Sequence, residues 1–304
     1  MKFRLTPILL SIIFLIGIAL PVALSEKHPV IANEERHETG AIVANANLEL
    51  QPTCAIRPDP NPAVASSQVG PGISQPAPLF RFRRPIAWQN SAAAAASPTG
   101  YTPMEYQAIA NPTNYGQRYI YDINGQPTNH VPIIVLHETA ATSQSTINFF
   151  QTPHSSEDNQ ASYHTLITLN GDIVYIVPPD LRAFGAGNSV FVGSRGTEAV
   201  KTHPNYPPSV NNFAYHISLE TPPDGMNNGS GHSGYTMPQY QSLAWLVSRT
   251  GVPRDRITTH AAVDRSGERS DPRSFDRELF SQLLSQYPQT LEIVIGCQAP
   301  RQRG

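Results

Sequence analysis

Three residues of this sequence, His137, His260 and Asp271, have side chains of the kind that bind transition metals. His137 ends VPIIVLH, a run of aliphatic residues typical of a buried central strand. His260 and Asp271 lie at the two ends of a loop that contains Gly, Ser and Arg. Two imidazoles and one carboxylate, with a fourth position open for water, form the ligand set of a catalytic zinc. The alternatives are that His137 caps its strand, His260 lies on the surface and Asp271 caps the last helix.

The run NFAYHISLE ends at Glu220 and adds a carboxylate at the end of a second predicted strand. Because side chains alternate along a strand, His216, Ser218 and Glu220 share one face. A carboxylate that faces a zinc-bound water is suited to act as a general base. The alternative is a structural role, in which Glu220 pairs with an arginine or caps a turn.

Strands and helices are predicted to alternate from about Tyr101 onward. The runs PIIVLH, SYHTLITL, GDIVYIV and NFAYHISLE predict strands, with a hairpin turn at Asn170-Gly171. Helices are predicted over 143–150, over 238–250 with Thr236 as a cap, and from near Phe275, with a short strand or turn over 257–259. This order predicts an α/β fold, a single domain with a central mixed β-sheet flanked by helices.

The first 100 residues differ from the rest in composition. Residues 1–25 combine two early positive charges with an apolar stretch and a small-residue end, the pattern of a secretory signal peptide. An uncleaved N-terminal membrane anchor is the alternative, and either would export the rest of the chain. Residues 26–100 are rich in Pro, Ala and Ser and predict a linker, solvated at 81–88 unless that segment docks on the domain. The domain is expected over 101–304.

The net charge indicates which partners the chain can bind, and the cysteines bear on whether it is exported. The formal net charge of the 304 residues is -2, whereas a nucleic-acid-binding protein normally carries a basic excess, so no nucleic acid partner is expected. Cys54 and Cys297 are the two cysteines. In an exported chain they favour a disulfide, and two unpaired thiols remain the alternative.

Together these segments resemble the zinc-dependent N-acetylmuramoyl-L-alanine amidases of type 2, the family related to T7 lysozyme and to the peptidoglycan recognition proteins. The resemblance covers about 132–280, where five motifs occur in the family's order: VLHETA, the run from SYHTLITL to FGAGNS, HISLE, ITTHAAVD and RSDPRSFD. It implies that the zinc ligands are His137, His260 and Asp271, and that the catalytic residues are Glu220, Arg269 and Tyr163.

Some positions depart from the family's pattern. Arg269 stands where many members have a lysine that stabilises the oxyanion, which keeps the charge but changes the hydrogen-bond geometry. Tyr163 matches a tyrosine that lies near the metal in part of the family, and core packing is its alternative role. Gly185, in AFGAG, stands where many relatives have a histidine, so the contact made by that side chain is absent here.

The resemblance implies hydrolysis of the amide bond between the lactyl group of N-acetylmuramic acid and the L-alanine of the peptidoglycan stem peptide. The implied cofactor is Zn²⁺, and the implied partners are peptidoglycan or muropeptides. Such a substrate fits a periplasmic or cell-envelope location. A non-catalytic peptidoglycan-binding module and a zinc hydrolase of another amide are the alternative functions.

Overall fold

The structure is a computed structural model that describes residues 54–60, 79–84 and 100–297 of the chain. The chain divides into two compact units, 1–47 and 48–304, and every described residue lies in the second. The predicted signal peptide or anchor over residues 1–25 therefore lies outside the described residues. Among the helices of the described part, none has the length and apolar character needed to cross a bilayer.

A six-stranded mixed sheet forms the centre of this unit. In spatial order its strands are β1 (Glu105–Gln107), β5 (Ile173–Tyr175), β4 (Thr165–Ile167), β9 (Ala214–Leu219), β3 (Ile133–Glu138) and β10 (Ile257–Thr259). Only the β4–β5 pair of this sheet is antiparallel, and the other neighbours run parallel. Strands β3 and β9 are buried along their whole length, as expected of central strands covered on both faces.

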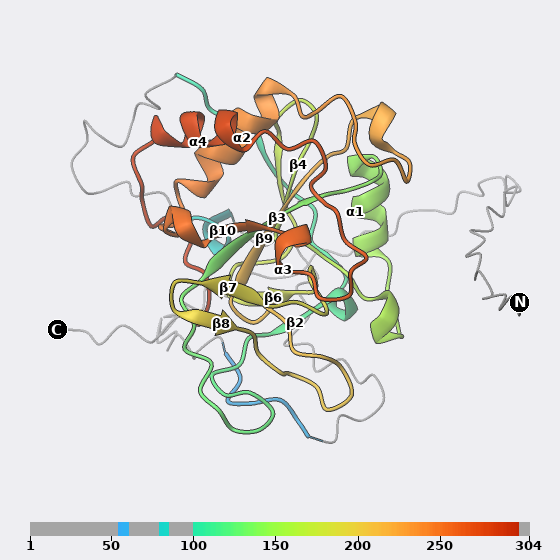
Figure 1. Cartoon of the computed structure of the whole chain (residues 1–304), viewed down its shortest axis with the longest axis vertical. Coiled ribbons are helices and arrows are strands. Elements are labelled where there is room, and N and C mark those ends of the chain that lie inside the picture. Colours follow the sequence, from blue (N-terminus) through green and yellow to red (C-terminus); the bar gives the residue numbers. More distant parts are fainter. Residues whose placement is uncertain (1–53, 61–78, 85–99, 298–304) are drawn as a thin grey trace, which may run out of the picture. The chain divides into compact units, whose positions relative to one another are not determined.

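Helices α2 (Met237–Val247) and α4 (Arg277–Ser285) cover one face of the sheet and lie side by side in Figure 1. Leu136 and Ile217 point into the core beneath them, where they pack with Leu243, Leu246 and Phe280. This face carries the largest apolar cluster of the described residues. It provides the hydrophobic burial that holds β3 and β9 in place.

The opposite face of β3 and β9 is more polar. Val135 and Ala214 pack there with Phe191, and α1 (Ser143–Gln151) contributes Phe150 to a third cluster. Short elements complete this side. They are β2 (Tyr115–Gln117) paired with β6 (Leu181–Ala183), β7 (Phe191–Gly193) paired with β8 (Gly196–Glu198), and α3 (His260–Val263).

The predicted α/β fold with a mixed sheet is confirmed, and most element boundaries lie within a few residues of the predictions. Thr236 caps α2 through a capping box with Gln239, although α2 ends at Val247, before the predicted limit. The cap of α4 is Asp276, so the alternative in which Asp271 caps the last helix is wrong.

Part of the predicted linker belongs to the packed unit. Phe82 is 1% exposed and stacks on Tyr175. The guanidinium of Arg83 donates to Glu105 and Glu292 at 2.6 to 3.0 Å. The alternative in which this segment docks on the domain is therefore confirmed for residues 81–84, because the Phe82 ring and a partly buried ion pair of Arg83 anchor them.

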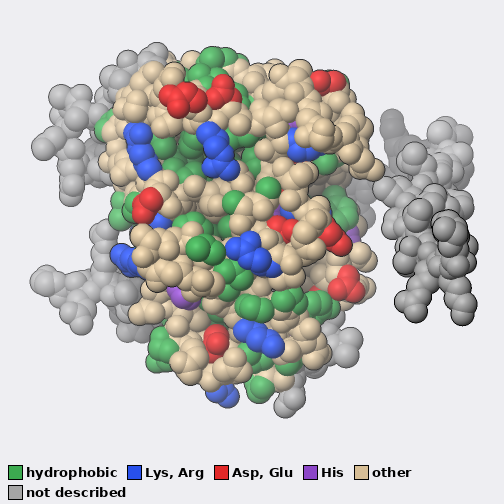
Figure 2. Space-filling view, viewed as in Figure 1, with side chains coloured by type: hydrophobic (Ala, Val, Ile, Leu, Met, Phe, Trp, Pro, Cys, Tyr) green, Lys and Arg blue, Asp and Glu red, His purple; other side chains and the backbone are tan. Residues whose placement is uncertain are grey.

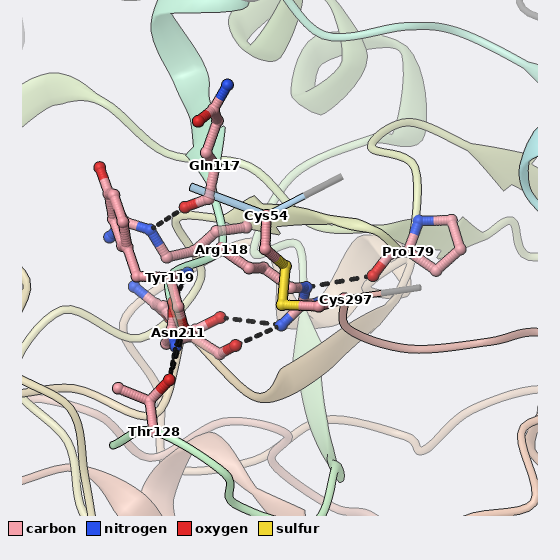
Figure 3. Close-up of a disulfide and its surroundings, with 10 residues drawn as sticks. Cys54, Gln117, Arg118, Tyr119, Thr128, Pro179, Asn211 and Cys297 are labelled. Carbon is pink, nitrogen blue, oxygen red and sulfur yellow. Dashed lines mark hydrogen bonds between the residues drawn. A yellow bond between two sulfur atoms is a disulfide. The ribbon is translucent and has the colours of Figure 1, made fainter. Parts of the chain in front are cut away.

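The disulfide favoured from the sequence is present between Cys54 and Cys297. It ties the described N-terminal segment to the end of the domain, and Ala55 pairs with Tyr119 beside it. Figure 3 shows Arg118 next to this bond, with its guanidinium directed at backbone carbonyl groups, including that of Pro179 at 3.1 Å. Burial lowers the pKa of Arg118 to about 9.

Candidate metal centre

His137, His260 and Asp271 come together in the structure, with one potential ligand atom of each within 4.8 Å of the others. His137 Nδ1 lies 3.3 Å from Asp271 Oδ2, and His260 Nδ1 lies 3.0 Å from Asp271 Oδ1. The two imidazole rings meet edge to face with centroids 4.6 Å apart. Within the described residues, no other group of three or more such side chains has this geometry.

Each of the three residues is held by a different element. His137 is near the end of β3, and His260 directly follows β10, which pairs with β3 in parallel register. Because parallel neighbours end at the same edge of a sheet, the two imidazoles are delivered to one place. The loop that carries Asp271 is fixed by a backbone hydrogen bond from Ala261 to the Asp271 carbonyl.

The donor set fits a divalent metal such as zinc. His137 Nδ1 is buried and has no hydrogen-bond partner anywhere in the described structure, even though Asp271 is near. A buried ring nitrogen without a partner is costly in a protein interior, and a metal ion would satisfy it. Two nitrogens and one carboxylate oxygen also leave a coordination position free, as in catalytic zinc sites.

The protonation states of the cluster favour metal binding. Burial lowers the pKa of His137 to about 4, so its imidazole is neutral near pH 7. Burial opposes ionisation of Asp271, but the nearby imidazoles of His137 and His260 outweigh that effect and lower its pKa. Neutral imidazole and ionised carboxylate are the forms that bind metal ions.

Tyr163 lies against the cluster, as the resemblance implies. Its ring stacks on His137 with centroids 4.5 Å apart and meets Phe150 edge to face at 5.2 Å. Burial raises the pKa of Tyr163, so its hydroxyl keeps its proton near neutral pH. The residue can therefore both pack against the core and offer a hydrogen-bond donor at the site.

Arg269 has an exposed side chain on the loop between His260 and Asp271. The loop folds around the carboxylate of Asp264, which accepts hydrogen bonds from the N–H groups of Ser266, Gly267 and Glu268 at 2.8 to 3.1 Å. Burial is the main cause of the lowered pKa of His137, to which the positive charge of Arg269 adds, and at Tyr163 that charge opposes the larger increase caused by burial. Arg269 is therefore close enough to influence the site electrostatically, although it forms no ion pair with Asp271 in the described structure.

The carboxylate of Glu220 accepts two backbone hydrogen bonds. Its Oε1 accepts from the backbone N–H of Ser143 at 2.8 Å, and its Oε2 accepts from that of Leu169 at 2.9 Å. Both oxygens are thus engaged by the start of α1 and by the turn after β4. These two hydrogen bonds fix the carboxylate and leave each oxygen a second lone pair.

His216 is a site residue that the motifs do not identify. Its Nδ1 lies 2.9 Å from Nε2 of His137, and its ring is fully buried. Behind it, the backbone N–H of His216 donates to Nδ1 of His164, also fully buried. Burial lowers the pKa of both residues well below the usual histidine value. The only signal in the sequence was the alternation that placed His216 on the face of Glu220.

A comparison with known protein families decides the assignment of this domain. The family model described as N-acetylmuramoyl-L-alanine amidase matches residues 126–274, a range that contains every residue predicted for the site. Residues 126–274 belong to the N-acetylmuramoyl-L-alanine amidase family. Family membership indicates a hydrolytic amidase that acts on peptidoglycan. No curated protein sequence matches the chain.

Solved structures of amidases are similar to this amidase domain. A selenomethionine derivative of AmpD is 24% identical, with a TM-score of 0.41, over 61% of this chain and 97% of that one. AmiD from E. coli, in complex with the substrate anhydro-N-acetylmuramic acid-L-Ala-D-gamma-Glu-L-Lys, is 23% identical, with a TM-score of 0.36, over 51% and 57%. AmiA from Staphylococcus aureus, in complex with its ligand, is 16% identical, with a TM-score of 0.38, over 68% and 95%.

The surface of the amidase domain carries both signs of charge. Figure 2 shows Lys and Arg scattered among Asp, Glu and apolar side chains on the face in view. On that face the basic side chains do not form one continuous area.

Proposed function

We propose that this protein is a zinc-dependent N-acetylmuramoyl-L-alanine amidase. It would hydrolyse the amide bond between the lactyl group of N-acetylmuramic acid and the L-alanine of the stem peptide. The observation that supports this most directly is the convergence of His137, His260 and Asp271, with the buried Nδ1 of His137 left without a partner. The family match supports the same reaction class.

His137, His260 and Asp271 would hold the zinc. When bound, zinc supplies Lewis acidity that lowers the pKa of a water molecule and polarises a carbonyl group. Asp271 contributes the negative charge that partly neutralises the ion, and the sheet edge holds the two imidazoles in place. Together the three side chains define the position at which an amide would be attacked.

Arg269 and Tyr163 would act on the substrate. The Arg269 guanidinium is suited to stabilise the oxyanion that forms as the amide carbonyl is attacked. Tyr163 would donate a hydrogen bond from its protonated hydroxyl to the reacting amide. Glu220 would take a proton from the attacking water and return it to the departing amino group of L-alanine, since each of its oxygens accepts a single backbone hydrogen bond and keeps a second lone pair.

Both the proposed substrate and the disulfide support export of the protein. Peptidoglycan lies outside the cytoplasmic membrane, and disulfides persist in oxidising compartments such as the periplasm. The bond between Cys54 and Cys297 therefore supports a periplasmic or cell-envelope location, either after signal cleavage or with an N-terminal anchor.

The proposal is tested with the purified full chain, loaded with zinc and incubated with peptidoglycan and with muropeptides. Mass spectrometry should detect free stem peptides that begin with L-alanine, and a His137→Ala variant should release none. Binding to peptidoglycan without such products would place the protein among the recognition modules. Cleavage of unrelated peptides but not of muropeptides would identify a hydrolase of another amide.

A further inference from the structure

We propose that His216 is a positioning residue for the metal centre, which fixes the orientation and the tautomer of His137. The proposal rests on the proposed function in that His137 binds a metal through Nδ1. It concerns a side chain that does not itself reach the metal. His216 lies on β9, one strand away from His137 on β3.

The contact between the two rings is direct, and both rings are fully buried. His137 Nε2 and His216 Nδ1 are 2.9 Å apart, and both side chains are fully buried. Their ring planes are inclined at 49°, with centroids 5.1 Å apart. A hydrogen bond of this length between two fully buried rings restricts rotation of the His137 ring about its side-chain torsions.

The direction of this hydrogen bond follows from what His137 must do. A ring nitrogen that binds a metal carries no proton, so a neutral His137 that binds through Nδ1 carries its proton on Nε2. That N–H then donates to Nδ1 of His216, whose own proton is on Nε2, a buried nitrogen with no acceptor among the described residues. The reverse arrangement would put a proton on His137 Nδ1 and close the site to a metal ion.

The backbone around His216 holds it in register. Its N–H donates to Nδ1 of His164 at 2.9 Å, and Nε2 of His164 lies 3.1 Å from the carbonyl oxygen of Leu181. Because Nδ1 of His164 accepts, the proton of a neutral His164 is on Nε2 and bonds to Leu181, and the Arg118 guanidinium lies 3.1 Å from the same Nε2. The strand position of His216 is thus fixed from the side opposite to His137.

Gly185 provides the space for the His216 ring. A Cβ atom added at Gly185 would lie 2.6 Å from both Cγ and Nδ1 of His216. Such distances are far below van der Waals contact, so a side chain at 185 would displace the ring. One of these two atoms, Nδ1, is the atom that contacts His137.

The first test compares two substitutions at the same position. His216→Asn places an amide oxygen near the position of Nδ1 and keeps an acceptor, whereas His216→Leu has similar bulk and no acceptor. Zinc affinity of the full chain is measured at one pH by competition with a chelator. We expect His216→Leu to weaken zinc binding about 10- to 100-fold and His216→Asn to restore most of the loss, as for other groups that orient metal ligands. Equal affinities in both variants and the unchanged chain would overturn the proposal.

A second test covers the case in which His216→Leu does not fold. Gly185→Ala should weaken zinc binding in the unchanged chain but have little further effect in a His216→Ala background, which lacks both Cγ and Nδ1. An equal loss in both backgrounds would show that Gly185 acts independently of His216 and would contradict the proposal. Absence of zinc binding by the unchanged chain would instead refute the proposed function.

Discussion

Two neighbouring residues of β3, His137 and Glu138, lead to two buried polar clusters with opposite properties. Glu138 accepts hydrogen bonds from Nε of Arg273, from Nε2 of His232 at 3.0 Å and from the hydroxyl of Tyr235 at 2.8 Å. Every oxygen of Glu138 has a partner. His137, which alternation turns to the other face of the strand, leaves one ring nitrogen without a partner in the described part of the chain.

The difference separates a structural cluster from a functional one. In the Glu138 cluster, the Arg273 guanidinium also donates to the carbonyl oxygens of Gly225, Asn227 and Gly229 at 2.6 to 3.0 Å, so it organises a glycine-rich loop. Nothing remains there for a ligand to satisfy. In the His137 cluster the protein's own groups do not complete the hydrogen bonding, which is the condition under which a bound ion adds stability.

The largest effect on activity is expected from Asp271→Ala. Removal of the only anionic ligand should reduce bound zinc to background and lower hydrolysis about 1000-fold or more, equivalent to about 4 kcal/mol. Metal analysis and product release from muropeptides measure this. Asp276→Ala is the matched control, because it removes the cap of α4 and should cost about 1 kcal/mol of stability without loss of zinc. If Asp271→Ala retained zinc and activity, the His137 cluster would not be the metal centre, and its contrast with the Glu138 cluster would be wrong.

Glu138→Gln should act on stability rather than on the metal. The amide keeps the shape of the side chain but leaves the buried Arg273 charge without a counter-charge, which typically costs about 3–5 kcal/mol. Urea unfolding measures the loss, and the folded fraction should bind zinc in the same ratio as the unchanged chain. If stability stayed the same while turnover fell, Glu138 would have to be assigned to the reaction.

Glu220→Gln separates the two roles considered for this residue. Glu220 accepts hydrogen bonds from the backbone N–H groups of Ser143 and Leu169. The Glu220→Gln variant leaves one of these N–H groups without an acceptor, so its free energy of unfolding should fall by about 1–3 kcal/mol. If this were its only role, the turnover of the folded enzyme would change only a few-fold. As the proposed general base, Glu220 should also be needed for turnover, so we expect a loss of about 100-fold or more in the folded enzyme, and a change of only a few-fold would overturn that role. Unfolding and muropeptide hydrolysis are measured on the same preparation.

The sequence predicts the strands, the helices and the metal ligands because each depends on a local pattern. Alternation, capping residues and motif order are all visible along the chain. The roles of Glu220 and His216 depend instead on which strands and loops become neighbours. The register of β9 against β3 places His216 beside Val135, within reach of the His137 ring, and the fold of α1 brings Ser143 to Glu220. Long-range contacts of this kind leave no periodic signal, and the same holds for Phe82, whose burial depends on the packing of a separate segment.

The smallest effect is expected from Asp264, the fourth acid considered, whose side-chain hydrogen-bond partners are all local. Burial opposes its ionisation, but hydrogen bonds from the Ser266 hydroxyl and from loop N–H groups outweigh this and lower its pKa to about 2. A carboxylate with a lowered pKa stabilises the folded state above its unfolded value, about 3.8, and the contribution is lost as the pH falls toward 2. The stability difference between the unchanged chain and Asp264→Asn should therefore be full at pH 7, about 1 kcal/mol or less, and should vanish near pH 2. Urea unfolding across this pH range gives the difference, and a constant value would show that the charge of Asp264 does not hold the loop that carries Arg269.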